Sequence, residues 1–219
     1  MNADPPVTLV TGASRGLGYA LGLALGRRGH RIVALARTVG GLEDLDDAIR
    51  AAGGRQATLV PLDITDAGGL ARLALSIHER WGRLDLLVHC AAHAPNLAPA
   101  EHIEPEEFER SLAVNAAATQ VLIAVTFRLL KAAPAGRAVF CDDPAAGKFH
   151  GAYAASKAAM RALVEAYAAE HERLPPQVRL ITPPPMPTAL RARFHPGQNP
   201  AELTSPADAA EMLLPQILD

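Results

Sequence analysis

The chain has 219 residues, of which 49% are hydrophobic and 4% aromatic, and its formal net charge at pH 7 is −2. This length and composition predict one α/β domain over residues 1–219 with a substantial apolar core. The near-neutral charge, without a long basic run, argues against binding to nucleic acid or to a membrane surface. We also expect no segment long and apolar enough to span a membrane and no charged-then-apolar leader, and therefore a cytoplasmic location.

Apolar runs alternate along the chain with segments of helical spacing. Strands are predicted at residues 7–11, 31–37, 57–62, 84–89, 137–141 and 178–182. Helices are predicted from the first glycine turn to about residue 28 and at about 40–52, 67–81, 105–133, 152–172 and 206–218. This alternation predicts a doubly wound parallel sheet with helices on both faces, the strand order 3-2-1-4-5-6, and ligands at the carboxyl ends of strands one and four.

The first predicted strand is followed by a glycine-rich turn, Thr11-Gly12-Ala13-Ser14-Arg15-Gly16-Leu17-Gly18. Glycines permit a tight turn, close approach of a ligand to the backbone, and close packing of the helix on the sheet. The N-terminus of the helix offers free N–H groups and a partial positive charge to an anion. The turn therefore predicts a pyrophosphate site, and the alternative interpretation is a glycine turn without a ligand.

A second motif, Tyr153-Ala154-Ala155-Ser156-Lys157, lies in the helix predicted at 152–172. Residues four apart share a helix face, so the phenol and the ammonium are expected to lie together. A free tyrosine has a pKa of about 10, and a nearby ammonium lowers it. Tyr153 is thus a candidate to donate a proton to a substrate oxygen or nitrogen as hydride arrives.

These two motifs together resemble those of the short-chain dehydrogenases/reductases. The glycine spacing is similar to the TGxxxGxG signature of that family, and the tyrosine–lysine pair follows at the usual separation. The resemblance covers about residues 7–215 and implies a Rossmann fold and hydride transfer to C=O or C=N of a small-molecule substrate. It further implies that Lys157 holds the nicotinamide ribose and that Asn115 bends a helix and holds a water in the proton relay.

The end of the second predicted strand bears on the choice of cofactor. It reads Ala36-Arg37, where an acidic residue would bind the ribose diol of NAD, and Arg15 lies in the glycine turn. Two guanidinium groups near one ribose suit a 2′-phosphate, which favours NADP(H) over NAD(H). The alternative is that Arg37 is a solvated charge.

The resemblance extends to a larger set of cofactor-binding residues, and no metal site is predicted. Asp63 is expected near the adenine amino group, and Met186 and Thr188 near the nicotinamide carboxamide. The candidate cofactor-binding residues are Gly12, Ser14, Arg15, Gly16, Leu17, Gly18, Arg37, Asp63, Ile64, Ala91, Tyr153, Lys157, Pro183, Met186 and Thr188.

The sequence departs from the family pattern after strand five, where Asp142-Asp143 replaces a common Ser-Ser pair and Asp143 takes the place of the catalytic serine. An ionised aspartate repels an alkoxide, but a protonated one, favoured by burial or by a second carboxylate, serves as a donor. A similar Asp–Tyr–Lys arrangement occurs in pteridine and dihydromonapterin reductases, which makes a pterin-like substrate an alternative. A further alternative is a non-catalytic NADP(H)-binding sensor or partner subunit.

A second departure is His89-Cys90-Ala91-Ala92, which stands where the family has Asn-Asn-Ala-Gly. The two alanines still allow close approach of the cofactor, and His89 is expected to be a buried residue with its hydrogen bonds satisfied. Cys90 and Cys141 both end apolar runs and are expected to be buried free thiols.

The segment after strand six is expected to form a short, irregular lid at about residues 188–205. Pro184 stiffens the turn that leads into it, and Arg191, Arg193 and His195 are more readily explained as solvated lid charges than as a site for an anionic substrate. The family's seventh strand and glycine-containing tail are not visible, which removes one common subunit contact. We therefore expect a homodimer through helices 105–133 and 152–172 in preference to a tetramer.

Overall fold

The computed structural model describes residues 4–144 and 147–219. Within them six strands form one parallel sheet in the order β3-β2-β1-β4-β5-β6. The strands are β1 (Val7–Thr11), β2 (Arg31–Ala36), β3 (Thr58–Pro61), β4 (Leu86–His89), β5 (Arg137–Cys141) and β6 (Gln177–Ile181). The predicted doubly wound α/β class and strand order are confirmed.

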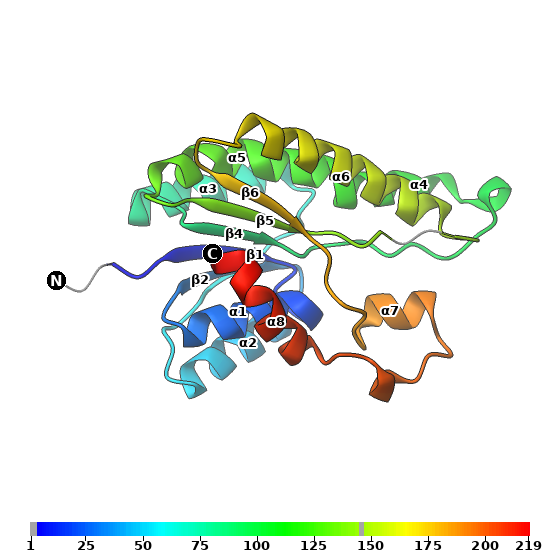
Figure 1. The fold of residues 1–219 in the computed structure, drawn as a ribbon, viewed down its shortest axis with the longest axis horizontal. Helices are drawn as coiled ribbons and strands as arrows, with labels where there is room; N and C mark the ends of the chain where they lie inside the picture. The colour runs from blue at the N-terminus through cyan, green and yellow to red at the C-terminus, as the bar shows by residue number, and fades with distance from the viewer. Residues whose placement is uncertain (1–3, 145–146) are drawn as a thin grey trace.

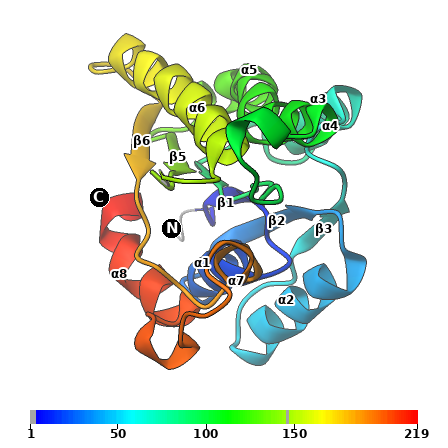
Figure 2. The ribbon, with the colours of Figure 1, turned by 90° about the vertical axis from the view of Figure 1, so that its right-hand side faces the viewer.

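Helices cover both faces of the sheet (Figure 2). One layer holds α1 (Gly16–Arg27), α2 (Val39–Ala51) and α8 (Pro206–Leu218), and the other holds α3 (Ala67–Trp81), α4 (Pro105–Leu112), α5 (Ala118–Ala132) and α6 (Gly151–Glu170). Successive residues of a strand face opposite layers, so Val10 belongs to the core with α1 and α8, and Leu9 to the core with α3 and α5. Burial on both faces explains why the strands read as continuous apolar runs.

Local side-chain and backbone chemistry sets where several helices begin and end. The Asp66 carboxylate accepts a hydrogen bond of 2.9 Å from the Gly69 N–H and so caps α3. After α1 and α3 the chain turns through Gly29 and Gly82, whose φ angles of 88° and 70° favour glycine. These turns return the chain to the sheet for the next strand.

Two expectations about irregular segments are corrected. The helix predicted at 105–133 is interrupted by one π-helical turn, η2 (Ala113–Ala117), between α4 and α5. The segment predicted as an irregular lid contains the short helix α7 (Ala189–Phe194) and the 3₁₀ turn η3 (Pro200–Glu202). A further 3₁₀ turn, η1 (Ala100–His102), precedes α4. Residues 145 and 146 of the predicted loop lie outside the described residues.

One helical stretch among the described residues, Pro105–Ala132, is long and apolar enough to cross a membrane by length and composition alone. The expectation that no segment reaches this level is therefore wrong. Core helices of soluble proteins pass the same test, and here Leu122, Leu129 and Leu130 are buried in the core between α5 and the sheet. The stretch is thus explained as a helix that packs on the sheet.

The carboxyl ends of the strands meet at one edge of the sheet, where the connecting loops gather. Segment 182–205, which carries α7, leaves β6 and passes across this edge before α8 returns to pack beside α1 (Figure 1). The fold thereby places the turn after β1, the loop after β4, the start of α6 and α7 around one cleft.

Candidate active site

The cleft at the carboxyl edge of the sheet has a volume of about 690 Å³. This volume falls in the range of small-molecule and cofactor sites. All the cofactor-binding residues predicted from the sequence line it, as do Asp142 and Asp143. Asn115 is not among the lining residues and lies behind them, next to the lining residue Val114. The sequence motifs therefore converge on one site, and the individual cofactor contacts remain predictions.

The glycine turn forms the floor of this cleft. Gly12 and Gly16 have φ angles of 69° and 58°, and a Cβ atom on Gly12 would lie 2.9 Å from the Ala91 nitrogen. A Cβ on Gly18 would clash with the Gly12 carbonyl oxygen. The N-terminus of α1 has no side-chain cap, so its backbone N–H groups are left for another acceptor. A close-fitting backbone with free donors suits a dinucleotide pyrophosphate.

Two candidate residues for the adenosine end lie together at the ends of β2 and β3. The Arg37 guanidinium is 3.9 Å from the Asp63 carboxylate, and both side chains are about half exposed. The Thr65 backbone N–H and hydroxyl donate to Asp63 at 2.9 and 2.8 Å, and these bonds lower the pKa of the Asp63 carboxyl. Exposed pairs of this kind contribute little free energy, so Arg37 remains free to bind a phosphate.

Helix α6 presents Tyr153 and Lys157 to the cleft one turn apart. The Tyr153 hydroxyl donates to the Asp143 carboxylate at 3.1 Å, and the Lys157 ammonium donates to the Cys141 carbonyl oxygen at 2.9 Å. Both α6 side chains are buried. Asp143, the candidate for the place of the family's serine, therefore contacts the candidate proton donor directly.

The protonation behaviour of Tyr153 differs from the sequence-based expectation. Burial raises the pKa of its phenol above the ordinary value, and the negative charge and hydrogen bond of Asp143 raise it further. The expected lowering of the Tyr153 pKa by Lys157 is thus wrong for this structure, because the phenol is buried and faces a carboxylate. At neutral pH Tyr153 carries its proton, which is the state required of an acid.

Asn115 occupies the π-helical turn between α4 and α5. Its side-chain oxygen accepts from the His93 N–H at 2.7 Å, and its amide donates to the His93 carbonyl at 3.0 Å and to the Ser156 hydroxyl at 2.9 Å. Ser156 in turn donates to the Tyr153 carbonyl at 2.8 Å. A π turn widens the helix locally and is frequent at functional sites. Asn115 therefore ties the loop after β4 to the helix that carries Tyr153.

Sequence reasoning missed the role of Ser156, although it stands within the quoted tyrosine–lysine motif. It also missed Phe194, at the end of α7, which is 6% exposed and packs edge-on against the Tyr153 ring with 4.8 Å between centroids. Phe194 also contacts the ring of His150, at 5.1 Å between centroids. An apolar pattern of alanine, leucine and phenylalanine in 189–194 was the available signal for this helix.

The predicted lid cations and Thr188 make contacts within the chain. The Arg191 side chain donates to the Gln198 side chain at 2.7 Å, and Arg193 donates to the Ala94 carbonyl. Thr188 accepts from the Arg191 N–H at 3.2 Å and so caps α7. The bond of Arg193 joins segment 188–205 to the loop after β4, and the other two bonds lie within the segment.

The loop after β4 is supported by histidine where the family has asparagine. His89 is buried, and its two ring nitrogens lie 2.7 and 3.1 Å from the Thr11 and Thr119 hydroxyls. Burial lowers the pKa of His89 to about 3, with a smaller contribution from Lys157. The expectation of a satisfied buried histidine is confirmed. Cys90 and Cys141 are free and half-buried, with 3.4 Å between their sulfur atoms.

We predict that His89 makes the chain sensitive to acid. The folded-state pKa of about 3 lies below the value of about 6.5 for an unfolded histidine, so the unfolded chain binds the proton first. The contribution to stability is complete above about pH 6.5 and declines as the pH falls toward 3. In the His89→Asn variant the free energy of unfolding should fall less steeply as the pH decreases, by up to about 1.4 kcal/mol per pH unit. Urea unfolding at several pH values measures this difference.

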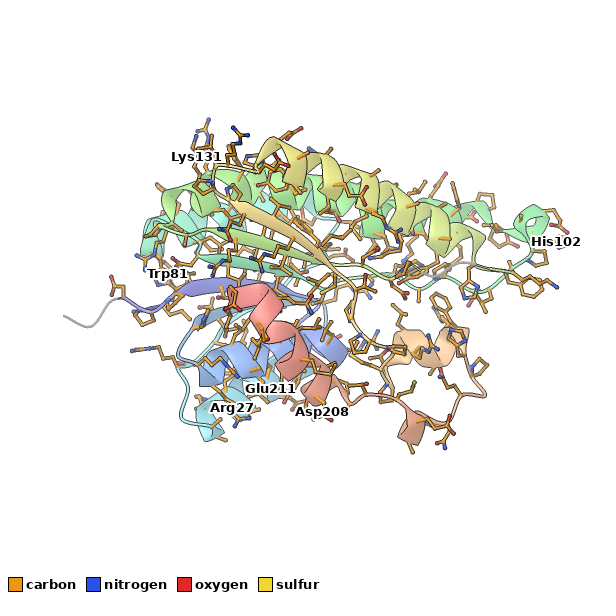
Figure 3. The ribbon with its side chains drawn as sticks, in the orientation of Figure 1. Arg27, Trp81, His102, Lys131, Asp208 and Glu211 are labelled. Carbon is orange, nitrogen blue, oxygen red and sulfur yellow. The ribbon has the colours of Figure 1, made fainter. Side chains whose placement is uncertain are left out.

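The matched control for this prediction is His102→Asn, since His102 is exposed at η1 on the surface of the molecule (Figure 3). The control variant should reproduce the pH dependence of the parent chain. Parallel stability curves for the parent and His89→Asn would show that the buried imidazole is not the acid-sensitive group.

Comparisons with known proteins agree with this site. The family model described as short chain dehydrogenase matches residues 6–199. YciK, an uncharacterized oxidoreductase of Escherichia coli K12, is 31% identical over 214 residues, which cover 95% of this chain and 84% of that protein. A short chain dehydrogenase of Escherichia coli CFT073, solved in complex with NADPH, is 30% identical with a TM-score of 0.91 over 98% of this chain and 91% of that one.

A second similar structure is a short chain dehydrogenase of Shigella flexneri complexed with NADP, which is 31% identical with a TM-score of 0.87. The match covers 93% of this chain and 87% of that chain. Because the family model spans most of the sequence and these relatives share the fold over most of their length, the chain belongs to the short-chain dehydrogenase family of Rossmann-fold oxidoreductases.

Proposed function

We propose that this chain is an NADPH-dependent reductase that transfers hydride to a C=O or C=N bond of a small molecule, with Tyr153 as the general acid. The observation that carries the proposal is that Tyr153 and Lys157 line the same cleft as the uncapped glycine turn. A nucleotide held at the turn and a proton donor on α6 would then meet in one enclosed space. When bound, NADPH supplies the hydride.

In this proposal, residues of the chain supply the proton, hold the cofactor ribose and position helix α6. The raised pKa of Tyr153 keeps its phenol protonated at neutral pH, ready to give the proton to the atom that gains negative charge. The Lys157 ammonium is anchored on the Cys141 carbonyl with two further N–H groups left for ribose hydroxyls. Asn115 and Ser156 fix the position of the helix that carries both groups.

Charge at the ends of the first two strands supports NADP(H) over NAD(H). Arg15 and Arg37 line the cleft, and Ala36 and Thr38 flank Arg37 without adding a carboxylate that would repel a 2′-phosphate. The two relatives whose complexes are described above hold NADP and NADPH. A guanidinium binds phosphate through charge-assisted hydrogen bonds that an uncharged ribose does not match.

The contact between Asp143 and Tyr153 favours reduction of a C=N bond as a second candidate function. A protonated Asp143 would return a proton to Tyr153 after Tyr153 has given its own to the substrate nitrogen. An ionised Asp143 would instead accept a hydrogen bond from a ring N–H of the substrate. The ionised state suits a pterin-like ring better than a simple ketone, whose oxygen only accepts.

We also propose that segment 188–205 is a lid on the substrate end of the cleft. Phe194 packs on the Tyr153 ring at the edge of the cleft, so movement of α7 would widen the path of a substrate to the phenol. Closure afterwards excludes water and strengthens the electrostatic interactions within the site.

We predict that Tyr153→Phe abolishes turnover and leaves NADPH binding intact. Loss of a positioned general acid costs about 10²- to 10⁴-fold in rate. The measurement is NADPH oxidation, followed by absorbance, with a panel of carbonyls, quinones and dihydropterins, together with an NADPH titration by fluorescence. Tyr167→Phe is the matched control, because Tyr167 is the other buried tyrosine of α6 and does not line the cleft.

The Asp143 variants separate the two candidate functions. Asp143→Asn should selectively slow reduction of the dihydropterin, and Asp143→Ser should keep turnover of simple carbonyls. NADPH binding without turnover of any substrate would instead favour a sensor or partner subunit. Binding of neither nucleotide would contradict the assignment of the glycine turn.

We predict that Arg37→Gln weakens NADPH binding about 10- to 100-fold and leaves NADH binding nearly unchanged. Loss of a hydrogen bond to a charged group costs about 1.5–3 kcal/mol, and each 1.4 kcal/mol is about tenfold in affinity. Arg31→Gln is the control, since Arg31 begins the same strand and does not line the cleft. Equal affinities of the parent chain for NADPH and NADH would contradict the prediction.

We further propose that the chain forms a homodimer through the outward faces of α5 and α6 and works in the cytoplasm. Exposed alanines, including Ala155, Ala158, Ala159 and Ala162, give α6 a smooth outer face that allows another helix to approach closely. The two cysteine thiols are unbonded although their sulfur atoms are 3.4 Å apart, as suits a reducing compartment.

Ala159→Arg is predicted to convert the dimer into a monomer, because it places a large charge in the contact between the helices. Sedimentation velocity measures the change. Ala71→Arg, an exposed alanine on α3, is the control and should leave the association state unchanged. A monomeric parent chain at all concentrations would rule out the interface.

A further inference from the structure

A cluster of charged side chains, of which Asp142 and Lys157 are buried and Arg161 is partly exposed, lies beside Tyr153 between the end of β5 and α6. Asp142 is 4% exposed and is the centre of the cluster. One of its carboxylate oxygens is 2.6 Å from the Arg161 guanidinium, and the other is 3.8 Å from the Lys157 ammonium. Lys157 and Arg161 are four residues apart, so they extend the α6 face that presents Tyr153. One carboxylate thus lies between two cations from the same helix.

The hydrogen bonds of this cluster are unevenly distributed. Arg161 holds one oxygen of Asp142, and the oxygen nearer to Lys157 has no hydrogen-bond partner among the described residues. Lys157 donates to the carbonyl of Cys141, the residue just before Asp142. The end of β5 therefore offers Lys157 both an anchoring carbonyl and a counter-charge, and Arg161 fixes the direction in which that counter-charge points.

A buried lysine needs such a counter-charge. Burial lowers the pKa of the Lys157 ammonium, and the negative charge of Asp142 is the largest influence in the opposite direction. The other groups that face Lys157 are Cys141 and Asp143 on the β5 side and Cys90 and neutral His89 on the β4 side. Of these only Asp142 is a buried carboxylate, and an uncompensated charge at this depth would favour the neutral amine.

We propose that Asp142, held in place by Arg161, is a positioning residue that keeps Lys157 charged and directed toward the cleft. Arg161 also offsets the charge that Asp142 adds beside the phenol, so two carboxylates at the end of β5 are matched by two cations on α6. Asp142 acts through Lys157 and makes no contact with a reacting atom. The consequence for turnover depends on the proposed function, whereas the consequence for the charge of Lys157 does not.

The direct test is the titration of Lys157 in protein labelled with ¹³C and ¹⁵N at lysine. The chain has only two other lysines, Lys131 and Lys148, and Lys131 lies at the far end of α5 (Figure 3), so the side-chain signals can be assigned by substitution. Asp142→Asn should lower the pKa of Lys157 by about one unit or more. Asp142→Ser removes the same charge with a smaller side chain and should give the same shift if the asparagine variant folds poorly.

Arg161 provides a prediction of opposite sign. Without Arg161 the carboxylate of Asp142 turns wholly to Lys157, so Arg161→Gln should raise the pKa of Lys157, and Arg161→Lys should restore the value of the parent chain. A residue that only supports packing would not shift the same lysine in opposite directions. Glu165→Gln, an exposed carboxylate on the same helix, is the matched control and should cause no shift.

Turnover gives a second readout. With any substrate found for the parent chain, Asp142→Asn should move the alkaline limb of the pH–rate profile to lower pH, while Arg161→Gln should lower kcat because Lys157 is drawn away from the ribose. An unchanged Lys157 titration in both Asp142 variants would overturn the inference. Absence of turnover in the parent chain would count against the proposed function alone, because the lysine titration still decides the role of Asp142.

Discussion

The cleft depends on the close approach of the glycine turn to the loop after β4. Gly12 leaves no room for a Cβ beside Ala91, and Thr11 joins the two segments because its hydroxyl accepts from the Ala91 N–H at 3.3 Å and contacts His89. His89 then reaches Thr119 on α5. In this chain the side chains of Thr11, His89 and Thr119 therefore support the turn through a chain of hydrogen bonds. His89 stands at a position where the family pattern has asparagine. The geometry of the floor of the cleft is thereby linked to a side chain whose hydrogen-bonding role requires that it stay neutral.

Charge is the second constraint, and it distinguishes the two neighbouring carboxylates after β5. Asp143 accepts from the Tyr153 phenol, whereas Asp142 lies between two cations of α6. The family pattern commonly has neutral serine hydroxyls where this chain has Asp142 and Asp143. Together with burial, the negative charges of these carboxylates raise the pKa of the Tyr153 phenol. Without a nearby cation, two negative charges would also be left uncompensated in a partly buried site. A second cation on α6 relieves that cost. The acidic pair is therefore balanced by two cations of α6, Lys157 and Arg161.

The sequence was sufficient for the strand order, for most element boundaries and for the gathering of the glycine turn, Tyr153 and Lys157 in one cleft. Those features follow from local turn chemistry, from the α-helical repeat and from the handedness of crossover connections. The sequence was not sufficient to predict features that depend on contacts between residues far apart in the chain. The π turn exists where Asn115 bonds simultaneously to His93 and Ser156, and the raised pKa of Tyr153 depends on a carboxylate and a burial that only the folded chain supplies. The link between Arg161 and Asp142 had a signal in the sequence, the spacing of four residues after Lys157, but its partner could not be identified without the end of β5.

Helix α7 connects the two ends of the site. Its N-terminal cap, Thr188, lies against Gly16, with its methyl group 3.3 Å from the position that a Cβ on that glycine would take. Its last residue, Phe194, packs on the ring of Tyr153. One short helix therefore contacts both the glycine turn, through the residue that caps it, and the candidate proton donor, through its last residue. The two motifs that the sequence places 135 residues apart, Gly18 and Tyr153, are thus bridged by a third segment that neither motif predicts.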